Sequence, residues 1–158
     1  MIEAQVVVPM LAEMLAPAAV LIAWSLVMLV WMAATRLPAM KRAGGGLGKA
    51  KPGGRGQDLE GVIDDRINWK AHNYAHLMEQ PTLFYAVSLI IALLGAGAGE
   101  VIAAWIYVAL RIVHSIWQAT VNLVPVRFLL FLLSTAALIY LAVRAIILTL
   151  FADPGIAA

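Results

Sequence analysis

Residues 72–95 read HNYAHLMEQPTLFYAVSLIIALLG, and the character of this stretch changes near its middle. Its first eight residues include two histidines, an asparagine and a glutamate, whereas residues 82–99 carry no charge. A helix needs about 20 mostly apolar residues to cross a bilayer. The stretch therefore predicts a membrane-spanning helix with ionisable side chains at membrane depth, where they are costly and mark functional sites.

Three further apolar runs surround this one in a chain of 158 residues, of which 63% are hydrophobic and 13% charged. Soluble domains are closer to half apolar and a quarter charged. The sequence has no cysteine, so disulfides and cysteine nucleophiles are excluded. We predict a single all-α integral membrane domain over residues 1–158, a bundle of four transmembrane helices. The expected spans, from about 20 apolar residues each, are about 10–36, 62–96, 100–122 and 127–151.

The connection between the first two spans, about residues 37–60, is rich in glycine and lysine and predicts a flexible loop without a packed core. Eight of the eleven Lys and Arg residues lie between Arg36 and Lys70. Basic residues favour the cytoplasmic face, so we expect this loop inside and both termini outside. The net charge of +2 gives no reason to expect a nucleic-acid partner.

The second predicted span carries His72, His76 and Glu79 at spacings of four and three residues, which places them on one helix face. Pro81 leaves the carbonyl of Leu77 without its helical donor and predicts a kink beside Glu79. Two further polar residues lie on or beside the same face: Asn73 and Arg66.

The third span has a polar stripe of its own, formed by Arg111, His114, Ser115 and Gln118. Arg111 falls near the bilayer centre, and an arginine cannot become neutral by losing its proton. We expect Glu79 as its partner, at similar depth. This pair is either part of a ligand site or only a link between two helices.

Arg127 opens the fourth span on the basic side, and Arg144 lies near its far end, where we expect its side chain to extend toward the headgroups. Two facing polar stripes with Arg127 at one end suit an anionic, amino-acid-like ligand, because arginine binds carboxylates through a planar fork. An arginine close to a thiol also stabilises the thiolate.

These polar segments resemble two signatures of the MAPEG family, the membrane-associated proteins in eicosanoid and glutathione metabolism, especially its bacterial members. The sequence HNYAHLMEQPTL at 72–83 resembles the helix 2 signature. The sequence LRIVHSIWQATVNLVPVRF at 110–128 resembles the signature from helix 3 to helix 4, including the spacing between its two arginines. With four spans and a basic first loop, the resemblance covers nearly the whole chain.

The resemblance implies a homotrimer in membrane lipid, with glutathione bound between neighbouring subunits and no metal. It implies conjugation of glutathione to hydrophobic small molecules, reduction of lipid hydroperoxides, or isomerisation of lipid peroxides. Arg127 matches the arginine held to activate the thiol, and the likeness to bacterial members implies an inner-membrane location. The candidate glutathione-binding residues are Glu79, Arg111, His76, Asn73, His72, His114, Gln118 and Arg66.

The sequence departs from the family pattern at three of these positions. His76 replaces a common asparagine, His72 replaces an arginine of many eukaryotic members, and Gln118 replaces a common tyrosine. Two alternative functions follow from the polar residues themselves. The three histidines with Glu79 can be read as a metal or haem site. The polar stripes can also simply hold together a non-catalytic protein that binds lipid or acts as a scaffold.

Overall fold

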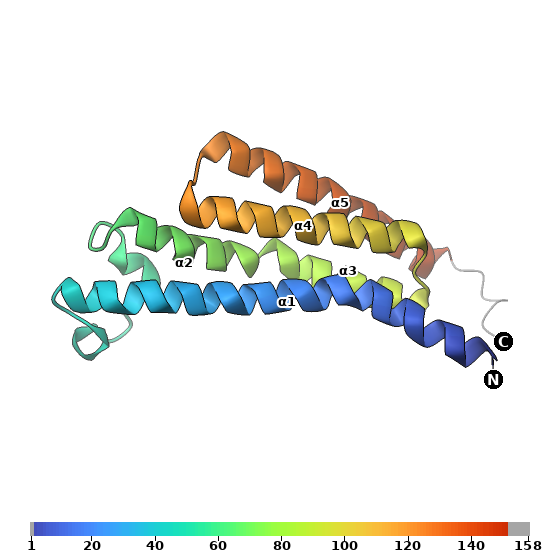
Figure 1. The fold of residues 1–158 in the computed structure, drawn as a ribbon, viewed down its shortest axis with the longest axis horizontal. Coiled ribbons are helices and arrows are strands. Elements are labelled where there is room, and N and C mark those ends of the chain that lie inside the picture. The colour runs from blue at the N-terminus through green and yellow to red at the C-terminus, as the bar shows by residue number, and fades with distance from the viewer. Residues whose placement is uncertain (1, 152–158) are drawn as a thin grey trace.

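The computed structural model describes residues 2–151, with the backbone alone for residues 2–10. That part of the chain is all helical and contains four segments long and apolar enough to cross a membrane, as the composition predicts (Figure 1). The second of these segments is made of two helices, α2 and α3. The helices are α1 (Ile2–Arg42), η1 (Leu47–Lys49), η2 (Gly56–Leu59), α2 (Asp65–Leu77), α3 (Gln80–Leu94), α4 (Ala98–Thr120) and α5 (Val124–Leu150).

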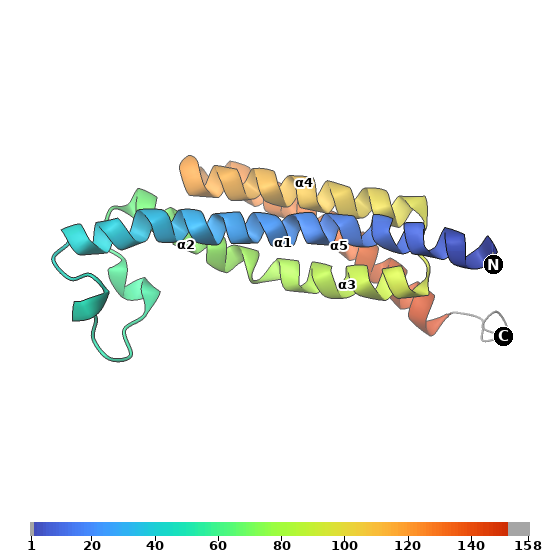
Figure 2. The same cartoon turned by 60° about the horizontal axis from the view of Figure 1, so that its bottom comes forward.

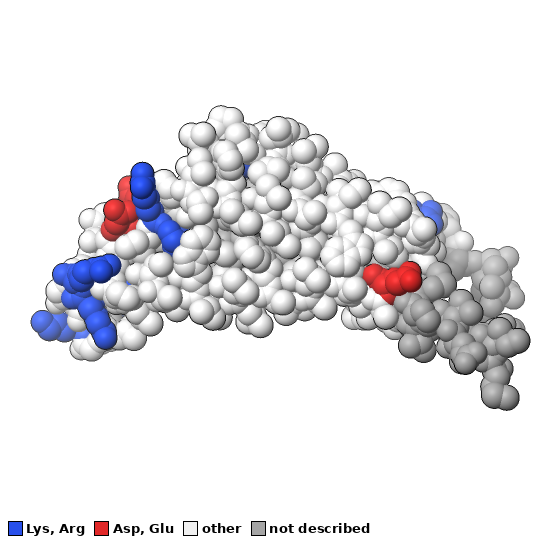
Figure 3. Space-filling view, viewed as in Figure 1, with Lys and Arg blue, Asp and Glu red and all other residues white. Residues whose placement is uncertain are grey.

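The long helices run side by side along one axis of the molecule (Figures 1 and 2). Helix α1 packs against α2, α3 and α4, whereas α5 packs against α4 and α3. The loop after α1, the start of α2 and the start of α5 share one end of the bundle. Figure 3 shows that most Lys and Arg side chains of the visible face gather at this end, while the middle is almost free of charged side chains. This end is called the basic end below.

The predicted kink at Pro81 is a complete break between two helices. Pro81 has no N–H to donate to the carbonyl of Leu77, and α2 ends there with a tight turn in which the Met78 N–H donates to the Ala75 carbonyl (2.9 Å). Glu79 has φ −91° and ψ −95°, outside the helical range, and Pro81 lies in the first turn of α3. The break therefore sits beside the polar side chains of α2.

A buried polar contact joins three helices. The Ser115 hydroxyl of α4 accepts hydrogen bonds from Trp24 Nε1 of α1 (3.0 Å) and from Asn73 Nδ2 of α2 (2.8 Å). Next to it lies an apolar core in which the rings of Phe84 and Tyr107 stack, with centroids 4.4 Å apart. These contacts fix α2 and α4 against each other at the depth of the polar stripes.

The expectation for Arg144 is wrong. Its Nε bonds to the carboxylate of Glu100, which is only 3% exposed at the start of α4 and also accepts the N–H of Gly97 (3.0 Å). A buried carboxylate needs a charged partner, and α5 supplies Arg144 at the matching height. The pair links α4 and α5 at the end opposite the basic end.

Candidate functional site

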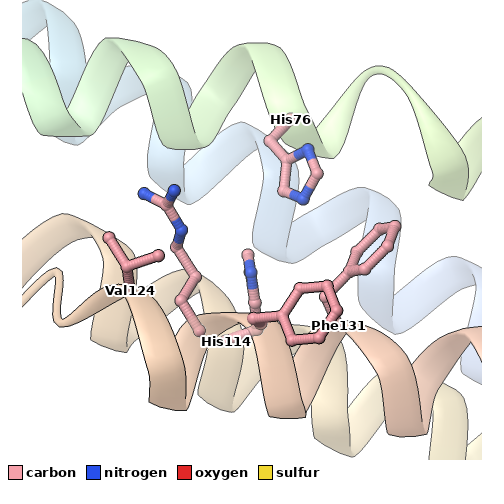
Figure 4. A pocket seen from close by; sticks show the side chains of 6 residues that line it. His76, His114, Val124 and Phe131 are labelled. Atoms are coloured by element: carbon pink, nitrogen blue, oxygen red, sulfur yellow. The ribbon is translucent and has the colours of Figure 1, made fainter.

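A hollow of about 200 Å³ lies where α5 passes α2 and α4 (Figure 4). It is lined by His76 of α2, His114 of α4, and Val124, Arg127, Phe128 and Phe131 of α5. We call it the arginine pocket. Residues that the sequence places on three separate helices thus come together, with a cationic side and an aromatic wall.

His76 is held from several directions in this pocket. Its ring centroid lies 5.1 Å from that of His114 and 5.5 Å from that of Phe131. Its Nδ1 lies 2.8 Å from Oε2 of Glu79, a carboxylate whose side chain is 66% exposed. Figure 4 shows the other ring nitrogen of His76 pointing toward His114. Glu79 therefore contacts the site through His76 and does not line the pocket itself.

Arg127 is half-buried and already has a partner that orients it. Its Nη1 donates to Oδ1 of Asn122 (2.7 Å), a residue of the turn between α4 and α5. Asn122 has φ +57°, a left-handed conformation that asparagine tolerates better than most residues. Asn122 and Phe131 were not among the residues predicted for the site. Their positions could have indicated them, because Asn122 is a polar residue in the turn before Pro125 and Phe131 is an aromatic residue one helical turn after Arg127.

The expected ion pair between Arg111 and Glu79 is absent. Arg111 is completely buried, and its Nη2 donates to the backbone carbonyl of His76 (2.9 Å). The break after α2 explains this partner, because the last carbonyls of a helix lack helical donors and attract cations. Arg111 therefore caps the end of α2, while the carboxylate of Glu79 turns outward to His76.

The other predicted site residues lie outside the arginine pocket. Asn73 and Gln118 are buried, and Asn73 is bonded to Ser115. Arg66 is exposed in the first turn of α2. His72 is exposed and bonds through Nε2 to Oε1 of Glu60 in the loop (3.0 Å).

His72 borders a second hollow, of about 260 Å³, at the basic end. There two contacts tether the loop, whose residues are nearly all exposed, in line with the predicted lack of a packed core. The guanidinium of Arg36 bonds to the Gly56 carbonyl, and Nδ2 of the buried Asn68 donates to the Leu59 carbonyl (3.2 Å). Side chains of α1 and α2 thus bind backbone carbonyls of the loop.

The structure gives no support to the alternative in which the histidines bind a metal ion or a haem. Among the residues that the structure describes, no group of three or more His, Asp or Glu side chains is placed to hold a metal ion. His72 is directed to Glu60, away from the ring pair of His76 and His114.

Four helical segments, each long and apolar enough to cross a membrane, indicate an α-helical integral membrane protein. Comparison with protein families narrows this class to one family: the model of the MAPEG family matches residues 14–147. The chain therefore belongs to the MAPEG family, whose members include glutathione transferases and peroxidases. No curated protein and no solved structure matched the chain.

Proposed function

We propose that this protein is a membrane-bound, glutathione-dependent transferase or peroxidase that acts on hydrophobic electrophiles or lipid hydroperoxides. The observation that carries the proposal is the arginine pocket in a MAPEG chain. It sets a guanidinium beside two imidazoles and an aromatic wall, between helices that cross the membrane. Such a pocket offers a cation to a thiolate or carboxylate and an apolar surface to a lipid-soluble substrate.

The size of the pocket favours a site shared between subunits. Ligand pockets usually measure about 300–1,000 Å³, and the arginine pocket of about 200 Å³ is smaller than this range. A tripeptide would extend beyond it. In this proposal the protein is a homotrimer, and a neighbouring subunit covers the rest of the glutathione.

The chemistry requires few groups from the protein. Arg127 stabilises the thiolate of glutathione, and Asn122 holds the guanidinium in place before the ligand arrives. The hydrophobic substrate enters from the lipid along Phe128 and Phe131, which line the pocket on α5. Rate enhancement then comes from positioning and from fixed charge in a water-poor site.

The same proposal includes the orientation. The basic end faces the cytoplasm of a bacterial inner membrane, which follows the rule that basic loops stay inside. Both ends of the chain then lie on the outer side. Cytosolic glutathione reaches the arginine pocket from the basic end, where α4 joins α5.

Turnover of glutathione by detergent-purified protein tests the proposal, with an aromatic halide and a lipid hydroperoxide as the two substrates. We expect turnover with at least one of them. Arg127→Gln should lower kcat/KM by about 100-fold, because it removes the charge that meets the thiolate. Arg42→Gln is the matched control, since Arg42 is exposed at the end of α1, and it should keep wild-type activity. Absence of turnover in the wild type, or equal activity in Arg127→Gln, would contradict the proposal.

A further inference from the structure

We propose that His76 is the general base of this site: its Nε2 removes the thiol proton of glutathione, and Glu79 is the positioning residue that orients the imidazole. This inference rests on the proposed function and adds to it a proton acceptor beside Arg127.

The pair of His76 and Glu79 lies at the break between α2 and α3. His76 belongs to the last turn of α2, Glu79 immediately precedes α3, and the Glu79 carboxylate lies 2.8 Å from Nδ1 of His76. The backbone of His76 is fixed as well, because buried Arg111 bonds to its carbonyl. The imidazole thus has a fixed attachment and a fixed partner.

The hydrogen bond to Glu79 decides which nitrogen is free. A carboxylate only accepts, so the proton of the neutral imidazole lies on Nδ1 and the lone pair on Nε2. Figure 4 shows that nitrogen pointing toward His114, in the pocket whose lining includes Arg127. A base oriented by a third group, next to the site of an acidic proton, is the arrangement that activates nucleophiles.

His114 lacks this arrangement. Its ring is 2% exposed, and in the part of the chain that the structure describes it has no hydrogen-bond partner that would fix its tautomer. It packs against the ring of His76 from α4. Of the two imidazoles in the pocket, His76 is therefore the one prepared to accept a proton.

Two of the surrounding charges match those that the proton transfer creates. Four titratable or charged groups face the imidazole: Glu79 before α3, Arg111 and His114 from α4, and Arg127 from α5. Transfer of the proton makes an imidazolium and a thiolate. Glu79 stabilises the first, and Arg127 stabilises the second.

The complete step balances for addition to an α,β-unsaturated carbonyl compound. The S–H bond breaks and its proton moves to Nε2, while the sulfur lone pair forms a C–S bond to the β-carbon. The electrons of the C=C bond pass to the carbonyl as an enolate. The α-carbon then takes a proton back from Nε2, so His76 ends neutral and no other reagent is consumed.

The test measures two properties of the wild type and of His76→Asn: the affinity for glutathione, and the turnover of glutathione with an α,β-unsaturated carbonyl compound. The asparagine amide keeps a donor for Glu79 but has no basic nitrogen. We expect glutathione affinity within a few-fold of wild type and a loss in kcat of about 100-fold or more. The wild-type rate should rise with pH as His76 loses its proton, and the variant should lack that rise. Added imidazole should partly restore His76→Ala.

Glu79→Gln and Glu60→Gln form a matched pair, because each removes the carboxylate of one histidine–glutamate contact. Only Glu79→Gln should lower kcat. An unchanged kcat and pH profile in His76→Asn would overturn the inference, and so would loss of glutathione binding in that variant, since His76 would then be a binding contact. If the wild type itself neither binds nor turns over glutathione, the proposed function fails instead.

Discussion

At the scale of single residues, Ser115 joins three helices through one hydroxyl. Its hydroxyl accepts from Trp24 and from Asn73, and it is completely buried. Ser134 on α5 is equally buried, but its hydroxyl bonds only to the Phe131 carbonyl of its own helix. Substitution of each serine therefore compares the contribution of a hydrogen bond between helices with that of a hydrogen bond within one helix.

We predict that Ser115→Ala lowers the free energy of unfolding by about 1–2 kcal/mol, because the buried amide of Asn73 and the half-buried indole N–H of Trp24 lose their acceptor. Ser134→Ala should change it by much less. Equilibrium unfolding of both variants in one detergent measures the difference. Equal effects of the two substitutions would show that the contact joining α1, α2 and α4 contributes no extra stability.

The sequence indicates which polar residues are buried but not how they pair. The spacing of Arg111, His114 and Ser115 correctly predicts one inward stripe, and all three are buried. The predicted ion pair between Arg111 and Glu79 was wrong because it was inferred only from the similar depth of the two residues along straight helices. The break leaves the His76 carbonyl available to the guanidinium of Arg111. The spacing of polar residues along the sequence does not reveal such a local change.

At the scale of elements, the break between α2 and α3 determines the geometry of the site. Pro81 was visible in the sequence as a kink, but a kink does not say where the flanking side chains turn. The observed break sends the Glu79 carboxylate to His76 and the His76 carbonyl to Arg111. The contacts of the loop with α1 and α2 were equally hidden, because they depend on Arg36 and Asn68 meeting backbone carbonyls.

We predict that Pro81→Ala lowers turnover by about 10- to 100-fold without unfolding the protein. Alanine restores an N–H that can bond to the Leu77 carbonyl, which favours one continuous helix and changes the angle at which Glu79 meets His76. A displacement of about 1 Å in a catalytic group can cost about 100-fold in rate. Helix content by circular dichroism, measured with the kinetics, shows whether the helix has straightened. A straightened helix with wild-type kcat would contradict this role of the break.

At the scale of the whole molecule, the four apolar segments present many large side chains outward, and two histidines and one arginine meet in a small pocket between α2, α4 and α5. Hydropathy and spacing predict this architecture, because a bilayer permits few alternatives to helices. The pocket itself depends on how α5 passes α2, which hydropathy does not describe. A neighbouring subunit completes the site in our proposal.

Glutathione binding to the intact, detergent-purified protein, measured by calorimetry, tests the central claim most directly. We predict saturable binding by the wild type and by Arg42→Gln, and binding weakened at least about 10-fold in Arg127→Gln, the loss expected for a charge-assisted contact. The absence of saturable binding at millimolar glutathione, or equal affinity in all three proteins, would contradict a glutathione site at the arginine pocket.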